Sequence, residues 1–389
     1  MIRKFLETIQ FGFLVLLMYI LPDLDCLIHF FKNRLIGFGI AVIKICQYIF
    51  PIIKYKCPNR KLLLSVLQSL GDDCHKYSID TQKILKEEGL LDIVNSIDNF
   101  PLHSGSIAQV FKGYDKDGNK LAIKIKHNYI DDQIMDIRHF VKSFKYFFKI
   151  NIDYNDFYSF LILQTDLQKE YDNLKYFYDS NPEKSKIIIP RPIYGSNKVL
   201  VMDWVDFQSF PSIENKLSRK ESKYYKYILS LFYDSSILLY KKEHCDLHHG
   251  NWGVNLKEKK IVILDFGIVF DTDPKFLNCH IDWRKEDDLK KKSSINCNLL
   301  STVFKTDLHL DLTCNDSIFK ALLELLSRSE ELVVTKDVFL LLSRIAFFGC
   351  INDDALMLNA QKKNIYLYLL KNNIFPELKS FYKKIIYND

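Results

Sequence analysis

Five polar residues that lie far apart in the chain have the types and the order that a phosphoryl-transfer site needs. Lys124 lies in the apolar run LAIKIK, and Glu170 lies in the segment LQTDLQKEYDNLKYF, whose leucines repeat at helical spacing. The segment HCDLHHGN contains Asp246 and Asn251 in the pattern H-x-D-x-x-x-x-N. An Asp-Phe-Gly triplet begins at Asp265, directly after the run IVIL. Each pattern is weak alone, but the ordered set favours phosphoryl transfer.

Each residue type suits one role in that chemistry. Lys124 would neutralise and position the α- and β-phosphates of ATP, and Glu170 would hold the lysine in place, because a buried lysine needs a carboxylate partner. Asn251 and Asp265 would bind Mg²⁺, and Asp246 would accept or orient the proton of the nucleophile. The sequence therefore predicts ATP and Mg²⁺ as cofactors.

The elements that would position these residues can be read from the apolar periodicity. The runs SIAQVFKGY and KLAIKIKH, joined by DKDGN, predict a β-hairpin that begins near Ser106 and carries Lys124 on its second strand. A β-rich interruption, NWGVNLKEKKIVILDFGIVF, is expected within a mostly helical second half, where the polar stretch 284–298 would be a surface loop or a helix end. Further helices are expected at 62–70, 81–94 and 153–178, and further strands at 186–189 and 199–205.

Two competing interpretations concern the same residues. A lysine on a strand among apolar neighbours can be structural, with its stem along the sheet edge and its ammonium group in water. The segment His244, Cys245, His248 and His249 could be a zinc site, because histidine and cysteine are good zinc ligands. However, no second ligand group with finger-like spacing occurs elsewhere, so the phosphoryl-transfer interpretation is favoured.

Composition excludes several classes of protein. With 389 residues, of which 48% are hydrophobic and 14% aromatic, the chain can bury a large core and is not a disordered segment. The net charge of +6 arises from 54 basic and 48 acidic residues without a dense basic block, so nucleic acid is not an expected partner. Nine widely spaced cysteines without a C-x-x-C pair indicate a reducing intracellular compartment.

The first fifty residues are conspicuously apolar. The run 11–22 has the length of the apolar region of a signal peptide, and the run 35–53 approaches the length of a membrane span, although Lys44 and Gln47 interrupt it. No small-residue cleavage site follows the first run, so a cleaved signal peptide is not expected. Two interpretations stay open here: a pair of helices packed on the domain, or membrane attachment through the apolar N-terminus.

The motifs resemble those of the AarF/UbiB family of atypical protein-kinase-like proteins. PLHSGSIAQV, residues 101–110, resembles the Ala-rich loop and S-I-A-Q-V signature of that family. LQTDLQKEYDN aligns Asp166, Glu170 and Asn173 with its E-x-D-x-x-x-E-x-x-N helix, HCDLHHGN resembles its catalytic loop, and LVMDWVD resembles its hinge. Lys76 falls at the lysine of its K-x-G-Q segment. The likeness extends from about residue 62 to residue 270.

The resemblance implies a fold and a nucleotide site. We expect an α+β, bilobal protein-kinase-like fold with an N-terminal helical, apolar extension at 1–100, a small lobe at 101–205 and a helical lobe at 206–389. The nucleotide would contact the loop and hinge as well as Lys124, through Ser104, Gly105, Ser106, Met202, Asp203 and Val205. Three departures are notable: Gln164 replaces the first Glu of E-x-D, Ser78-Ile79 replaces the G-Q of K-x-G-Q, and Gly105 replaces an alanine. The first two put in doubt the occlusion of the substrate cleft that is described for the family.

The function predicted from these observations is Mg²⁺-dependent ATP binding with ATP hydrolysis or phosphoryl transfer. The resemblance adds a link to isoprenoid-lipid (ubiquinone) metabolism, with membrane lipid or lipid-processing proteins as partners. Two alternatives remain: a nucleotide-binding scaffold that regulates a membrane partner without turnover, and a plain Ser/Thr protein kinase. The intact set Lys124, Glu170, Asp246, Asn251 and Asp265 argues against the scaffold.

Overall fold

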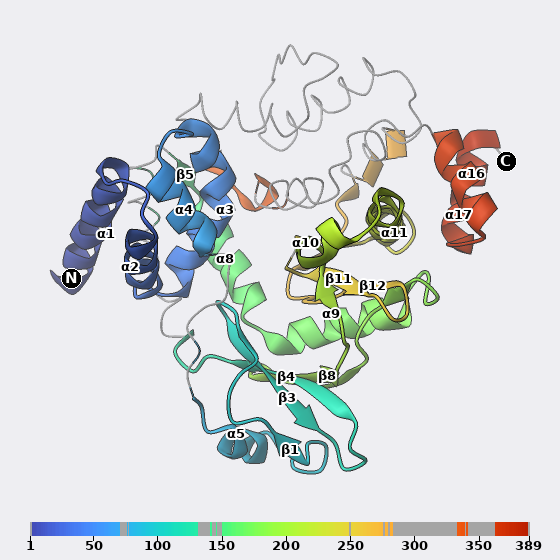
Figure 1. Ribbon diagram of the computed structural model, residues 1–389, viewed down its shortest axis with the longest axis horizontal. Coiled ribbons are helices and arrows are strands. Elements are labelled where there is room, and N and C mark those ends of the chain that lie inside the picture. The colour runs from blue at the N-terminus through green and yellow to red at the C-terminus, as the bar shows by residue number, and fades with distance from the viewer. Residues whose placement is uncertain are drawn as a thin grey trace. The chain divides into compact units, whose positions relative to one another are not determined.

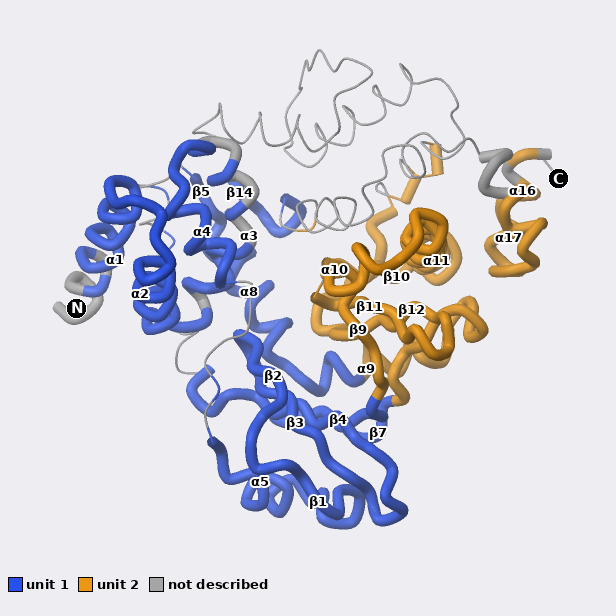
Figure 2. Tube along the Cα trace, viewed as in Figure 1, with its two compact units in different colours: residues 1–171, 192–204, 322–339 blue, residues 172–191, 205–321, 340–389 orange. Residues whose placement is uncertain are grey.

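The protein consists of two compact units, each built from several chain segments (Figure 2). The computed structural model describes residues 2–70, 76, 78–130, 141, 145, 150–248, 250–274, 277–278, 281–282, 333–338, 340 and 362–387. Unit 1 comprises Met1–Tyr171, Pro192–Trp204 and Leu322–Phe339, and unit 2 comprises Asp172–Arg191, Val205–Ala321 and Leu340–Asp389. The functional division at residues 101 and 206 remains a prediction.

Unit 1 contains a six-stranded sheet (Figure 1). Its order is β1-β3-β4-β8-β7, with β2 paired to β3, and every pairing is antiparallel. The strands are β1 Ser96–Ile97, β2 His103–Ser104, β3 Ala108–Tyr114, β4 Lys120–Lys126, β7 Pro192–Gly195 and β8 Val199–Asp203. The predicted hairpin is confirmed as β3–β4. Its turn is closed by Asp115, whose Oδ1 accepts the backbone N–H groups of Asp117 and Asn119.

Strand β7 was not predicted, because two prolines and a glycine at 190–195 indicated a break. It lies at the edge of the sheet, where a missing backbone N–H leaves no ladder bond unmade, so Pro192 is tolerated there.

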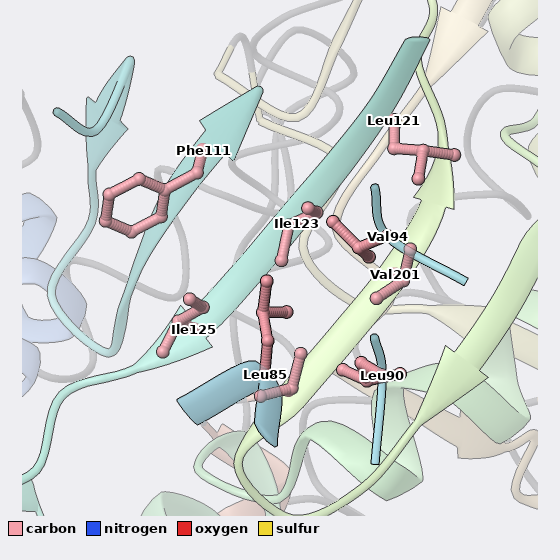
Figure 3. Packing of buried hydrophobic residues seen from close by; sticks show 9 residues of the cluster. Leu85, Leu90, Val94, Phe111, Leu121, Ile123, Ile125 and Val201 are labelled. Carbon is pink, nitrogen blue, oxygen red and sulfur yellow. The ribbon is translucent and has the colours of Figure 1, made fainter. Parts of the chain in front are cut away.

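One face of this sheet is covered by an apolar cluster. Leu121, Ile123 and Ile125 alternate along β4 and point to this face together with Phe111 of β3 and Val201 of β8. Helix α5, Thr81–Glu87, and the chain after it add Leu85, Leu90 and Val94 (Figure 3). This helix is shorter than the predicted 81–94, because the backbone turns into the left-handed region at Gly89, with φ of +68°, which ends a helix.

Before α5, the described residues form four helices: α1 Ile2–Ile20, α2 Asp25–Ile36, α3 Ile40–Lys56 and α4 Lys61–Ser69. The predicted helix at 62–70 is confirmed as α4, which packs against α1, α2 and α3. Helix α3 occupies much of the second apolar run and buries Val42, Ile45 and Ile53. In the described part of the chain, none of the helices combines the length and the apolar character needed to cross a membrane.

The helix predicted at 153–178 is two helices, α8 Tyr154–Gln164 and α9 Leu167–Asp179. The break lies at Thr165 and Asp166, because both side chains bond to the backbone instead of continuing the helix. Thr165 Oγ1 donates to the carbonyl of Ile162, and Asp166 Oδ1 accepts the N–H groups of Gln168 and Lys169. Beside α8, β5 Asn151–Ile152 pairs in parallel with β14 Val333–Val334.

Unit 2 combines helices with two small sheets, so the chain is of the α+β class. One sheet has the order β6-β12-β11-β9, and the other pairs β10 with β13. The strands are β6 Ile187–Ile188, β9 Gln208–Ser209, β10 Lys242–His244, β11 Trp252–Asn255, β12 Lys260–Ile263 and β13 Val269–Asp271. The predicted β-rich interruption is thus confirmed.

The described residues of unit 2 include the C-terminal part of α9 and the helices α10 Phe210–Ile213, η1 Glu214–Lys216 (a short 3-10 helix), α11 Arg219–Leu238, α16 Lys362–Asn372 and α17 Pro376–Tyr387. Helix α17 is attached to α11 inside the unit, since the hydroxyl of Tyr382 donates to buried Asp234 at 3.0 Å. The polar stretch 284–298 lies outside the described residues.

Candidate functional site

Lys124 and Glu170 form a buried ion pair in unit 1. Lys124 Nζ lies 2.9 Å from Oε1 and 2.8 Å from Oε2 of Glu170. The lysine side chain is 13% exposed and the glutamate side chain 3%. A charge pair taken out of water needs this two-oxygen geometry to offset its desolvation. The predicted partnership is therefore present, and the interpretation of Lys124 as a solvent-directed edge lysine is wrong.

The direction of Lys124 follows from strand alternation. Leu121, Ile123 and Ile125 face the apolar cluster, so Lys124 must project from the opposite face of β4. Glu170 lies in the first turn of α9, and Leu167, Leu174 and Phe177 are buried on that helix as the sequence predicted. Because Asp166 begins α9, its carboxylate sets where Glu170 falls on the helix.

The loop 104–107 is held by backbone bonds and by a histidine that the sequence analysis did not single out. Gly105 N–H donates to the carbonyl of Ala108 at 2.9 Å, and His127 N–H donates to that of Ile107 at 3.0 Å. His127 Nε2 lies 3.0 Å from the carbonyl oxygen of Gly105, which can only accept, so the ring donates. The ring stacks on Tyr129. Ser104 is buried, while Gly105 and Ser106 are half-buried.

Two buried histidines make the stability of the folded protein depend on pH. It lowers the pKa of His127 from 6.5, partly opposed by the bond to Gly105, and lowers the pKa of His244, partly opposed by Asp246 and Asp265. Below about pH 6.5 the unfolded chain therefore binds protons that the folded chain does not, so stability falls as pH drops from there toward the folded-state pKa values.

We expect the contribution of these two histidines to the free energy of unfolding, measured by urea titration, to be constant near pH 8. The free energy of unfolding should then fall as the pH is lowered toward 5. Each histidine contributes at most about 1.4 kcal/mol per pH unit. His127→Gln should make the fall shallower. An unchanged slope in that variant would contradict this assignment.

The predicted hinge residues continue β8 of unit 1. Met202 pairs with Ala122 and Asp203 with Leu121, next to the turn at which Trp204 N–H donates to the carbonyl of Lys120. Val205 is the first residue of the following segment of unit 2. Contact of adenine with Met202, Asp203 and Val205 remains a prediction.

In unit 2 the predicted catalytic loop brings Asp246 and Asn251 together. Asn251 Nδ2 donates to the backbone carbonyl of Asp246 at 2.8 Å and to its carboxylate Oδ2 at 3.1 Å. Asn251 N–H donates to the carbonyl of His248 at 2.9 Å, which closes the loop. Asp246 is half-buried and Asn251 is buried. The H-x-D-x-x-x-x-N spacing thus produces one hydrogen-bonded unit.

Asp265 is placed at the same end of the β11–β12 hairpin as Asn251. Strand β11 begins one residue after Asn251, β12 ends at Ile263, and Leu264 N–H donates to the carbonyl of Asn251 at 2.8 Å. The backbone of Asp265 is left-handed, with φ of +53°, and its Oδ1 accepts the N–H of Gly267 at 3.2 Å. Because of this turn, the side chains of Asp265 and buried Phe266 point in different directions.

Asn173, which the family alignment named without a role, supports the triplet. Its Nδ2 donates to the carbonyl of Phe266 at 2.9 Å, within unit 2. The ring of Phe266 packs at 5.1 Å from that of Phe177 and at 4.9 Å from that of His244. The only sequence signal for this contact was the final N of the E-x-D-x-x-x-E-x-x-N pattern.

The donor set of Asn251 and Asp265 suits magnesium. Both supply hard oxygen ligands, and Mg²⁺ is commonly bound by one or two protein groups with the remaining ligands from phosphates and water. For the zinc interpretation, Cys245 is buried with its Sγ toward the carbonyl of Glu243, and His249 lies outside the described residues. Within the described ranges, no three His, Cys, Asp or Glu side chains are grouped to hold a metal.

The two segments that depart in part from the family pattern, the one around Lys76 and the one around Gln164, lie in unit 1. Lys76 Nζ donates to the carbonyl of Leu102 at 2.7 Å, just before the loop 104–107. Gln164 is buried at the end of α8, where its Nε2 lies 3.4 Å from the carbonyl of Phe160 and its Oε1 has no hydrogen-bond partner among the described residues.

Comparison with known proteins gives a family and distant relatives. The model of the ABC1 atypical kinase-like domain matches residues 73–282. AarF domain-containing protein kinase 1 of Xenopus laevis is 26% identical over 242 residues, which cover 58% of this chain and 46% of that protein. Probable serine/threonine-protein kinase abkC of Dictyostelium discoideum is 25% identical over 206 residues, which cover 49% of this chain and 30% of that protein. The matched region thus spans less than half of either relative.

Two solved structures are similar at low identity. Rv3197 of Mycobacterium tuberculosis, in complex with erythromycin, has a TM-score of 0.44 and 15% identity, covering 73% of this chain and 85% of that one. The Rio2 kinase complex with ADP, Mg²⁺ and phosphoaspartate from Chaetomium thermophilum has a TM-score of 0.35 and 13% identity, covering 83% and 96%. Both TM-scores are low, so the fold assignment is carried by the family match.

Proposed function

We propose, from the premise that this chain belongs to the ABC1 atypical kinase-like family, that it binds ATP with Mg²⁺ and transfers or hydrolyses the γ-phosphoryl group. The family assignment agrees with the AarF/UbiB resemblance seen in the motifs. The support for turnover comes from this chain's own residues.

The observation that carries the proposal is the buried pair Lys124–Glu170. Well-packed apolar residues would stabilise such a position at least as well as an ion pair does, because desolvation cancels much of the Coulomb attraction. An ammonium group held by two carboxylate contacts at 2.8 and 2.9 Å is, however, already oriented and charged for phosphate oxygens. This supports a binding role for Lys124.

The other residues then divide the chemistry. Asp246, held by Asn251, would accept or orient the proton of the attacking group, and the turn at Asp265 presents a carboxylate for the metal. When bound, Mg²⁺ neutralises charge that develops on the phosphate oxygens. The loop 104–107 contains a glycine, which lets a phosphate approach the backbone closely, while the N–H of Gly105 itself donates to the carbonyl of Ala108.

The test is ATP turnover by the full chain, measured as phosphate release with Mg²⁺ and again after chelation with EDTA. We expect Mg²⁺-dependent turnover. ATP binding without turnover would select the scaffold alternative, and absence of both would reject the proposal. The isoprenoid-lipid link rests on the family resemblance, so a soluble ubiquinone analogue is the first effector of turnover to add, beside a generic Ser/Thr protein substrate whose hydroxyl groups can accept the phosphoryl group.

We also propose that the N-terminal helices attach the protein to an anionic membrane surface. Helix α1 buries Phe11, Leu14, Val15 and Met18, yet Ile9, Phe13, Leu16 and Ile20 are 52%, 58%, 55% and 69% exposed. These four residues are spaced i, i+4, i+7 and i+11, so they share one helix face. A row of four large apolar side chains in water is costly and needs a partner.

Charge favours a lipid partner for this face. Residues 1–60 contain eight basic and three acidic residues, a net charge of +5 out of +6 for the whole chain. Anionic lipid headgroups attract such a segment by about 1 kcal/mol for each basic residue near the surface. Burial of the exposed face of α1 at the headgroup boundary adds the apolar contribution.

The double variant Phe13→Glu, Leu16→Glu should bind phosphatidylglycerol-containing vesicles at least about tenfold more weakly in a sedimentation assay, since each buried apolar side chain contributes about 1.5–3 kcal/mol. The matched control is Leu367→Glu, Leu370→Glu, which alters two similarly exposed leucines of α16 and should bind normally. Equal binding by both variants would reject the proposal. Loss of a dimer in the first variant, without loss of vesicle binding, would assign the face to a second copy instead.

A further inference from the structure

The imidazole of His248 is held in one orientation on the catalytic loop of unit 2. Its Nδ1 accepts the backbone N–H of Gly250 at 3.0 Å. The ring also packs directly on Gly250, because a Cβ at that position would lie 2.7 Å from Cε1 of His248 and 3.0 Å from Nδ1. The ring of His248 therefore occupies the space that a side chain at residue 250 would need, and it accepts a hydrogen bond from the backbone of that residue.

This bond determines which nitrogen carries the proton in the neutral ring. Because Nδ1 accepts a hydrogen bond, the proton of a neutral imidazole lies on Nε2. Nε2 lies 3.7 Å from Oδ1 of Asp246. That separation is longer than a hydrogen bond, and such contacts often shorten when substrate is bound. The N–H group of His248 is thus available to the carboxylate that is proposed to receive the nucleophile's proton.

The two oxygens of Asp246 lie nearest to different side chains. Oδ2 accepts from Asn251 Nδ2 at 3.1 Å, and Oδ1 is the oxygen nearest to His248. We propose that His248 is a positioning residue for Asp246: its Nε2–H orients Oδ1 while Asn251 orients Oδ2, and Gly250 sets the direction of the ring. This inference rests on the proposed function, and it adds His248 and Gly250 to the residues on which that function depends.

A double-mutant cycle tests the inference in the full chain. His248→Ala should lower kcat by about ten- to a hundredfold, the cost of imprecise orientation, and leave the KM for ATP unchanged. Gly250→Ala should act in the same way, because its methyl group displaces the ring. The double variant should be no worse than either single variant, since both remove one interaction.

Two controls separate positioning from stability. His248→Gln keeps an acceptor for Gly250 and a donor for Asp246, so it should recover part of kcat. The melting temperature of every variant should stay near that of the wild type, because His248 is exposed. Additive losses in the cycle, or a rise in KM for ATP without a fall in kcat, would overturn the proposal.

A second measurement keeps this inference separate from the proposed function. In protein labelled with ¹⁵N-histidine, the His248 resonances, assigned with His248→Gln, should show a single Nε2–H tautomer at a pH where the ring is neutral. Gly250→Ala should abolish that signature, and Asp246→Asn should shift it. If the wild type lacks turnover, the proposed function fails, and the spectra alone then test the positioning of His248. A mixture of tautomers that neither substitution changes would reject this positioning.

Discussion

Lys124→Ala should eliminate measurable ATP turnover and lower the free energy of unfolding by about 3 kcal/mol. The stability loss arises because the Glu170 carboxylate, 3% exposed, would keep its charge without the ammonium group that lies against both of its oxygens. Breaking a buried pair costs about 3–5 kcal/mol, and the lower value applies since Lys124 retains some exposure. Urea denaturation measures the stability, and phosphate release measures the turnover.

The matched control is the double variant Lys124→Met, Glu170→Leu. Replacement of both charges by apolar side chains of similar size should restore most of the stability, because no unpaired charge remains. It should not restore turnover, since no cation is left to hold the phosphates. A double variant as unstable as Lys124→Ala would show that the pair is not the source of the loss. Normal turnover in either variant would remove Lys124 from the site.

Asp265→Asn should reduce turnover by about 10²- to 10³-fold, the effect of removing one preorganised electrostatic group, without a loss of stability. Asparagine suits this test because residue 265 has a left-handed backbone with φ of +53°, which asparagine tolerates. Alanine would add strain of about 1–2 kcal/mol and confuse the two effects. Excess Mg²⁺ should recover part of the activity if the loss is one of metal affinity.

The control for Asp265→Asn is the same chemical change at Asp271. That carboxylate is 84% exposed and pairs with Lys242 at the surface, where an ion pair contributes little. Asp271→Asn should therefore keep wild-type turnover and melting temperature. Equal turnover in Asp265→Asn and Asp271→Asn would contradict the assignment of a metal ligand to Asp265.

Local sequence patterns predicted which helices and strands surround the site, but they predicted the ends of these elements less well. The β3–β4 hairpin follows from a turn sequence between two alternating runs, and both signals act between near neighbours. The helix at 153–178 was predicted without its break, because apolar spacing continues across Thr165 and Asp166 while their side chains bond to the backbone. The strand at Pro192 was missed because its tolerance depends on an edge position in the sheet.

The sequence by itself determined which residues are available for chemistry and on which side of its strand Lys124 lies, because alternation and motif spacing depend on residues close together in the chain. The types of Lys124 and Glu170 also predicted that the two would pair, but the contacts that bring the distant groups together depend on the tertiary structure. Glu170 reaches Lys124 across 46 positions and Asn173 reaches Phe266 across 93, while Asp166, from the same motif, begins a helix. Such partnerships depend on how helices pack against strands, and the placement of His248 against Gly250 depends on loop closure. Neither the packing of helices against strands nor the closure of this loop can be read from the spacing of the residues.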